Sequence, residues 1–197
     1  MTDLSRREAL SLLAAVPVVL VQPVTARRVH AALREALAAG QAYAPKFFTA
    51  HEYQTTRVLV DLVLPADERS GSATDALVPE FMDYIASEYE HHRLPLRGGL
   101  AWLDAECERR FGTVFLDSTA TQRTAVLDDI AWPKKARPEM SQGVSFFNHF
   151  RDLTASGFFS SQMGVKDLRY LGNTFVAEWK GCPPEALAKL GVSYPAD

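Results

Sequence analysis

No segment of this chain alternates apolar and polar residues with the period of two that a half-buried strand requires. Apolar residues recur instead at spacings of three and four, as they do along one face of a helix. The first such stretch runs from Arg27 to Ala39, and Gly40 follows it as a natural helix stop. The pattern predicts an all-α fold of about six helices in one compact domain, followed by an extended C-terminal tail.

Two capping boxes mark expected helix starts. Thr49 is followed by Glu52 and Thr119 by Gln122, so each threonine hydroxyl can accept a bond from a backbone N–H at the helix start. The glutamate or glutamine side chain can return a bond to the threonine N–H. We expect helices to begin at both threonines, the first running as far as Pro65.

A further helix is expected to begin at Pro79, because proline suits the first turn of a helix. Glu80 and Asp83 would then lie near the positive end of the helix dipole. The face expected to point inward carries three large residues, Phe81, Ile85 and Tyr89.

Proline and glycine divide the rest of the chain. Pro95 and the Gly98-Gly99 pair are expected to break the chain before a helix that ends at Gly112. An aromatic helix is expected to reach Phe159, with Phe147 and Phe150 in the core. From about residue 160 the chain is rich in proline and glycine, which predicts a tail with one short helix, Pro184 to Leu190.

The first 26 residues have the three-part layout of a secretory signal. Arg6 and Arg7 precede an uncharged run from Ala9 to Val21, which is too short to span a bilayer. Small residues follow and predict cleavage after Ala26. The paired arginines are typical of the twin-arginine pathway, which exports folded proteins. We therefore expect a periplasmic protein whose mature domain covers 27–197; the alternative is a buried N-terminal helix.

The search for chemistry excludes several classes of protein. A formal net charge of −3, with no basic stripe, argues against nucleic-acid binding. The chain contains no glycine-rich dinucleotide motif, no phosphate loop and no haem-attachment motif. We therefore expect this chain to hold no redox cofactor of its own.

One metal-binding pattern is present. Glu88 and His91 are three residues apart, with His92 four from Glu88, a spacing that places a carboxylate and an imidazole on one helix face. A di-iron bundle uses two such motifs and two further glutamates, and only one motif occurs here. An exported metal-dependent enzyme using Glu88 and His91 is thus one alternative function, and a periplasmic binding module is another. The simpler interpretation is a solvated helix end where histidines favour the negative C-terminus.

The two cysteines, Cys107 and Cys182, are free to pair in an oxidising compartment. The sequence leaves two alternatives open. In one, Cys107 is buried and Cys182 is exposed; in the other, Cys182 bonds to a partner chain.

Three groups of residues, in this order, resemble the gluconate 2-dehydrogenase subunit 3 family. They are Leu62 to Asp67 with its Pro-Ala-Asp turn, Val78-Pro79-Glu80-Phe81-Met82-Asp83, and the series Phe146-Phe147, Leu153-Thr154 and Gly157-Phe158-Phe159. The segment Trp179 to Glu185 also looks like the ending of family members. The resemblance covers roughly Phe48 to the C-terminus, and the twin-arginine leader fits it.

The resemblance implies a non-catalytic small subunit of a membrane-associated sugar or polyol dehydrogenase. Its partner would be a larger flavoprotein of the glucose/methanol/choline oxidoreductase family, which holds FAD and passes electrons to a cytochrome of the c type. The small subunit's signal would carry both chains out, so this chain would act as export escort, stabiliser and scaffold. The family offers no catalytic, cofactor-binding or metal-binding residue to assign here.

Under this interpretation the aromatic helix and the tail would contact the partner. The candidate interface residues are Phe158, Phe159, Trp179 and Cys182. For Phe158 and Phe159, packing in the core is the competing expectation.

Overall fold

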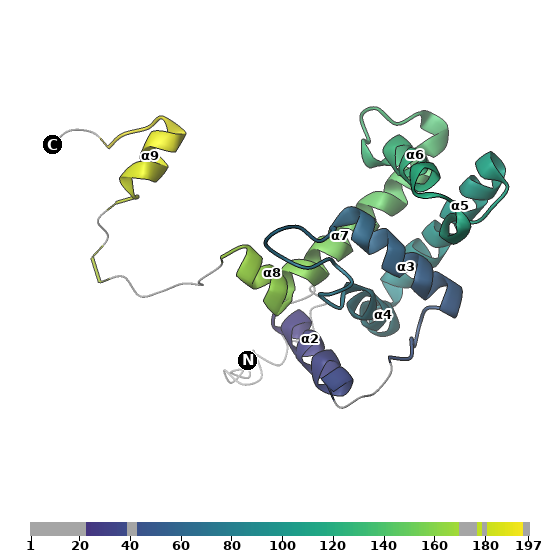
Figure 1. The fold of residues 1–197 in the computed structure, drawn as a ribbon, viewed down its shortest axis with the longest axis horizontal. Coiled ribbons are helices and arrows are strands. Elements are labelled where there is room, and N and C mark those ends of the chain that lie inside the picture. The colour runs from purple at the N-terminus through teal and green to yellow at the C-terminus, as the bar shows by residue number, and fades with distance from the viewer. Residues whose placement is uncertain (1–22, 39–42, 170–176, 179–180, 195–197) are drawn as a thin grey trace, which may run out of the picture.

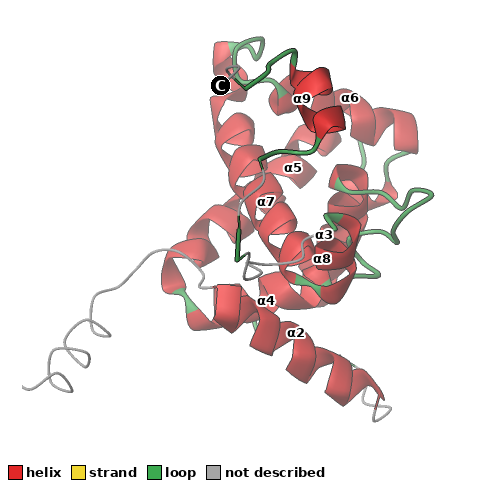
Figure 2. Ribbon diagram, turned by 90° about the vertical axis from the view of Figure 1, so that its left-hand side faces the viewer, coloured by secondary structure: helices red, strands yellow, loops and turns green. Residues whose placement is uncertain are grey.

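The computed structural model describes residues 23–38, 43–169, 177–178 and 181–194. Within these ranges the chain forms eight α-helices and three short 3-10 helices, with no strand (Figure 2), which confirms the all-α prediction. The α-helices are α2 (Pro23–Ala38), α3 (Ala50–Val63), α4 (Val78–Glu88), α5 (Arg93–Phe111), α6 (Ala120–Ala131), α7 (Ser141–Ser160), α8 (Gln162–Asp167) and α9 (Pro184–Leu190). The 3-10 helices are η1 (Glu90–His92), η2 (Phe115–Asp117) and η3 (Pro138–Met140).

Helix α7 is the centre of the packed body, and α2, α3, α4, α5, α6 and α8 all contact it (Figure 1). Its aromatic residues explain this position, since large rings gain most from leaving water. Phe147 and Phe150 are buried as expected, and so are Phe146 and Leu153. The hydrophobic core therefore surrounds the aromatic helix on several sides.

Both predicted capping boxes are present. At the start of α3 the Glu52 N–H donates to Thr49 Oγ1 over 3.2 Å, and the Thr49 N–H donates to Glu52 Oε2 over 2.8 Å. The same reciprocal pair joins Thr119 and Gln122 at the start of α6. Helix α5 ends as expected at Gly112, whose φ of 75° lies in the left-handed region that glycine adopts without strain.

The predicted break at Pro95 and Gly98-Gly99 is wrong, because these residues lie inside the continuous helix α5. Pro95 lies in the first turn, where backbone N–H groups have no partner within the helix and proline is tolerated. Gly99 faces the ring of Phe146 on α7, and a Cβ at this position would lie 2.6 Å from Cε2 of that ring. The glycine therefore permits the close approach of α5 to α7.

Helix α4 buries Phe81 and Ile85 completely, as expected, but Tyr89 does not join them. Tyr89 is the residue that ends α4, and it is 37% exposed. The last helical residue is Glu88, and Tyr89 has an extended backbone, so its side chain does not continue the inward face.

Helix α2 lies against α4 and α7 (Figure 1). Val29 is buried, and the fully enclosed His30 ring stacks on Phe81 with centroids 5.2 Å apart. His30 Nε2 donates to the Gly157 carbonyl of α7 over 2.8 Å. Burial lowers the pKa of His30, so the ring stays neutral at pH 7. The predicted cleavage point after Ala26 falls within α2, and cleavage stays a prediction.

Helix α8 is an element that we did not expect, in a region predicted to be tail. It follows α7 at once, and Ser161 begins it by accepting a bond from the Gly164 N–H over 3.0 Å. Gly164 is buried against the end of α7. The packed body therefore extends to the end of α8, and α9, which confirms the short helix expected near the C-terminus, stands apart from it in Figure 1.

Candidate functional site

The Val-Pro-Glu-Phe-Met-Asp motif begins α4, and its aspartate organises the chain that leads into α3. Asp83 is fully buried and accepts a bond from the Tyr43 hydroxyl over 2.7 Å. Its two oxygens also accept bonds of 2.7 to 2.9 Å from the backbone N–H groups of Lys46, Phe47 and Phe48. This one carboxylate therefore anchors the segment 43–48 on α4.

The glutamate of the same motif is also buried, and it ties α3 to α4. Tyr53 donates its hydroxyl to Glu80 Oε1 over 2.6 Å. Burial, and next the bond to Glu80, raise the pKa of Tyr53; burial and the bond to Asp83 do the same for Tyr43. Both tyrosines therefore keep their protons as donors. The sequence predicted only that Glu80 and Asp83 would lie near a helix dipole, and their partners came from other elements.

The proposed pairing of Glu88 with His91 does not form on one helix face, because α4 ends at Glu88 and His91 lies in η1. His92 is not solvated either. It is 8% exposed, and its Nδ1 lies 3.1 Å from Nε2 of His149 on α7. Burial lowers the pKa of His92 to about 4, with the neighbouring His91 and His149 adding to the effect. The two rings are thus a neutral pair in which one N–H donates to the other nitrogen.

The described residues gather no group of three or more histidine, cysteine, aspartate or glutamate side chains that would hold a metal ion. Two serines close to His149 in sequence are also engaged elsewhere. Ser160 Oγ donates to the Gly157 carbonyl over 3.1 Å, and Ser161 Oγ donates to the Phe158 carbonyl over 2.6 Å. These hydroxyls stabilise the end of α7 and do not meet an imidazole.

Of the three arrangements left open for the cysteines, the structure has Cys107 buried on α5 and Cys182 exposed, both as free thiols. Burial raises the pKa of the Cys107 thiol, which keeps it protonated. A bond between Cys107 and Cys182 in an oxidising compartment stays a possibility raised by the sequence.

The candidate interface residues fall in different environments. Phe158 is 3% exposed and belongs to the core, while Phe159 is half-buried and meets Phe158 edge-on with centroids 5.2 Å apart. Phe158 therefore offers no ring to a partner. Trp179, like Arg6 and Arg7, lies outside the described residues.

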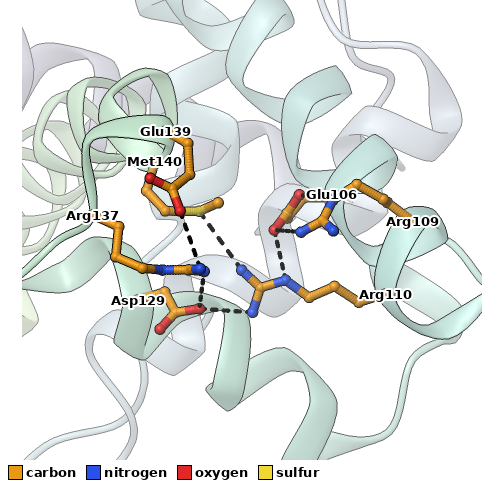
Figure 3. Close-up of polar contacts among 7 residues, drawn as sticks. All are labelled: Glu106, Arg109, Arg110, Asp129, Arg137, Glu139 and Met140. Carbon is orange, nitrogen blue, oxygen red and sulfur yellow. Dashed lines mark hydrogen bonds and ion pairs between the residues drawn. The ribbon is translucent and has the colours of Figure 1, made fainter.

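A network of ion pairs that we did not predict joins the end of α5 to the segment between α6 and α7 (Figure 3). Glu106 is buried and accepts two bonds from Arg109, of 2.7 and 2.8 Å, and one from Arg110 of 2.6 Å. The bond from Arg109, with that from Arg110, holds the pKa of Glu106 below its usual value. The spacing Glu106-x-x-Arg109-Arg110 was visible in the sequence as an i,i+3 and i,i+4 pattern.

Arg110 then links Glu106 to other elements. Its Nη1 donates to Asp129 Oδ2 on α6 over 2.7 Å, and its Nη2 approaches the Met140 sulfur at 3.6 Å (Figure 3). Arg137 lies 3.7 Å from the same Asp129 oxygen. Arginine suits this position because its planar guanidinium donates in several directions at once.

A groove of about 500 Å³ opens between the first turns of α5 and the first half of α7. Its walls include Leu94, Pro95, Trp102 and Phe146, and His149 lies at its edge. The walls are mainly apolar, and the hydrophilic residues that line the groove, Gln142, Ser145 and His149, all come from α7.

No helix of the described residues has the length and the apolar character needed to cross a membrane. The described part is a helical domain in which Asp83, Glu80, His30 and the hydroxyls of Tyr43 and Tyr53 bond to other parts of the same chain, while Thr55 Oγ1, Thr56 Oγ1 and Glu80 Oε2 are buried without a partner. These bonds hold helices and loops together.

Comparison with known proteins identifies the family. The family model described as gluconate 2-dehydrogenase subunit 3 matches residues 50–178, well over half of the chain, and the chain belongs to this family. The matched region contains α3 to α8, including the Asp83 anchor and the aromatic helix α7. A search of curated proteins finds no match, and neither does a search of solved structures. The family is that of one subunit in a multi-subunit dehydrogenase, which confirms the resemblance described above.

Proposed function

We propose that this chain is the non-catalytic small subunit of a periplasmic, FAD-dependent dehydrogenase that oxidises gluconate or a related sugar. Its role is to escort the catalytic flavoprotein through export, to stabilise it and to provide a scaffold for assembly. The observation that carries the proposal is membership of the subunit 3 family over residues 50–178.

The structure supports a scaffolding role through the use of its polar residues. Asp83, an acid of the family-like motif, is saturated by Tyr43 and three backbone N–H groups, and Glu80 accepts a bond from Tyr53 at Oε1, although its Oε2 is buried without a partner. Buried side chains committed in this way stabilise a fold and are poorly placed to turn over a substrate.

The cofactor is assigned to the partner because this sequence carries no dinucleotide-binding motif. A catalytic subunit of the glucose/methanol/choline oxidoreductase family would supply FAD, and a c-type cytochrome would accept the electrons. Substrate oxidation would then occur entirely on the flavoprotein.

The leader supplies the export function. The twin-arginine pathway carries proteins that are already folded, and Arg6 and Arg7 match its signature. A flavoprotein that binds FAD in the cytoplasm and has no leader of its own would cross the membrane only when bound to this chain.

The test is co-expression of this chain with the product of its flanking gene, which we expect to be the flavoprotein, followed by fractionation. We expect the flavoprotein to purify with this chain from the periplasm, and to remain in the cytoplasm when Arg6 and Arg7 are both changed to lysine. Arg27 and Arg28 offer a matched control, because they are an exposed pair of arginines on α2. Their replacement by lysine should leave export unchanged.

Three results bear against the proposal. If no flavoprotein purifies with the wild-type chain, the role as a small subunit fails. If the flavoprotein reaches the periplasm with the Arg6→Lys/Arg7→Lys chain, the escort role fails. If the purified chain alone oxidises sugars, it is not the accessory subunit.

A further inference from the structure

The turn that follows α6 presents the most exposed aromatic side chain of the described residues. Trp132 caps α6 and is 63% exposed, whereas most aromatic side chains of the packed body are buried or half-buried. Pro133, Lys134 and Lys135 follow it, and all are exposed. We call residues 132–137 the Trp132 turn. An exposed tryptophan contributes none of the stabilising free energy that burial of its large apolar ring would give.

The Trp132 turn is held in a fixed shape. The Trp132 carbonyl accepts bonds from the N–H groups of Lys135, over 2.8 Å, and Ala136, over 3.0 Å. Asp129, three residues before Trp132, receives both Arg110 of α5 and Arg137 at the far end of the turn (Figure 3). The network in Figure 3 therefore clamps both ends of the turn to α5.

A rigid loop of this kind loses less conformational entropy on binding than an exposed flexible loop does. A contact residue that is already ordered loses little conformational entropy when it binds, so more of its burial appears as affinity. On α5 the side chains of this network, Glu106 and Arg110, are only 8% and 16% exposed, while Asp129 and Arg137 at the turn are 39% and 58% exposed.

The indole has a cationic border. Lys135 Nζ lies 5.8 Å from the centre of the Trp132 ring, and neither Lys134 nor Lys135 forms an ion pair among the described residues. The neighbouring acids Asp129 and Glu139 are already paired with arginines. Asp128, an exposed acid one turn before Trp132, forms no ion pair among the described residues, so the unpaired charges beside the turn are two lysines and one aspartate, a net charge of +1. A complementary surface would therefore carry more acidic than basic groups.

An exposed tryptophan bordered by lysines can bind to two kinds of surface. One is a protein, and the other is an anionic membrane. Polybasic segments that hold to anionic membranes carry about four to eight cations, and the Trp132 turn has two unpaired ones. Tryptophan on a rigid support is the residue type most enriched at the energetic centres of protein interfaces. The observations therefore favour a protein.

We propose that the Trp132 turn docks on the catalytic subunit of the dehydrogenase complex, with the indole in an apolar pocket and Lys134 and Lys135 facing carboxylates at its rim. This inference rests on the proposed function, since it takes the partner from it. It places the contact between α6 and α7, away from Phe158 at the end of α7.

The test is a competition inside cells. The flavoprotein is co-expressed with two copies of this full chain, one wild type and one variant, carrying different affinity tags. We expect Trp132→Ala to weaken binding at least 30-fold, so that nearly all recovered flavoprotein carries the wild-type copy. Lys134→Glu/Lys135→Glu should also lose the competition, and more completely at low salt.

Leu94→Ala is the matched control, because Leu94 is 81% exposed at the opposite end of α5 and belongs to no network. This copy should be recovered equally with wild type. Circular dichroism of each purified variant should match wild type, since an exposed ring contributes little to folding.

The outcomes separate the two proposals. If the wild-type copy binds the flavoprotein and Trp132→Ala competes equally, the docking inference is overturned and the proposed function stands. If the wild-type copy binds no flavoprotein, both are overturned. If the purified wild-type chain sediments with phosphatidylcholine vesicles containing phosphatidylserine, and only this property is lost in Trp132→Ala, the turn is a membrane contact instead.

Discussion

The two adjacent glycines of α5 should respond in opposite directions to the same substitution. A Cβ added at Gly98 meets no atom within 4 Å, because this residue faces solvent. Gly98→Ala should therefore stabilise the protein by about 0.5 to 1 kcal/mol, since alanine is the better helix former and restricts the unfolded chain. A Cβ added at Gly99 would instead overlap the Phe146 ring.

The cost at Gly99 follows from this overlap. Inserting a methyl group into a packed helix contact costs about 1 to 3 kcal/mol, against which alanine regains under 1 kcal/mol of helix propensity. We expect Gly99→Ala to destabilise the protein by about 2 kcal/mol, so that the two variants differ by about 3 kcal/mol. For a domain of this size, that corresponds to a difference of about 9 °C in the melting temperature.

Urea unfolding followed by far-UV circular dichroism measures both free energies directly. A double-mutant cycle with Phe146→Leu identifies the contact, because a smaller side chain on α7 should make Gly99→Ala less costly by at least about 1 kcal/mol. The reasoning is refuted if Gly99→Ala is as stable as Gly98→Ala. It is also refuted if the cycle shows strict additivity.

Three further predictions concern single buried groups. Asp83→Asn should lower the free energy of unfolding by about 3 kcal/mol, because an amide cannot accept all four bonds that the carboxylate accepts. Tyr43→Phe removes only one of these bonds and should cost about 1 kcal/mol. Equal losses of the two variants in urea unfolding would contradict this. The pKa of His92 is lowered to about 4 in the folded protein, so between pH 6.5 and 4 the unfolded chain binds a proton that the folded chain does not. The free energy of unfolding should therefore be highest above pH 6.5 and fall by about 3 kcal/mol as the pH drops to 4. His92→Asn should flatten this slope, and parallel curves would argue against it. Cys182 should react at once with a thiol reagent, and Cys107 only after denaturant is added; immediate reaction of both would show that Cys107 is accessible.

Signals that act within one helical turn could be predicted from the sequence. The capping boxes at Thr49 and Thr119 and the stop at Gly112 each depend on residues no more than four positions apart. Helix α8 has a signal of the same kind in Ser161, which caps it through Gly164. This signal lies in the stretch from about residue 160, whose proline and glycine content predicts a tail.

Contacts between distant segments explain the other errors. Gly98 and Gly99 have the local pattern of a break, and only the ring of Phe146 on α7 shows why Gly99 is small. Asp83 has the local pattern of a dipole partner, yet its donors lie in the segment 43–48. His92 has the pattern of an exposed helix end until His149 covers it. In each case the neighbour that determines the structure is far away in the sequence, so helix propensity and residue spacing could not predict the contact.

The bond between His30 and the Gly157 carbonyl also has a consequence for the order of folding. These residues are 127 positions apart, so the ribosome must synthesise most of the chain before α2 can find its place on α7. Closing so long a loop is entropically slow compared with forming the contacts among α3, α4 and α5. The first described helix to be synthesised can therefore complete its packing only after most of α7 has been made, although its contact with α4 can form earlier.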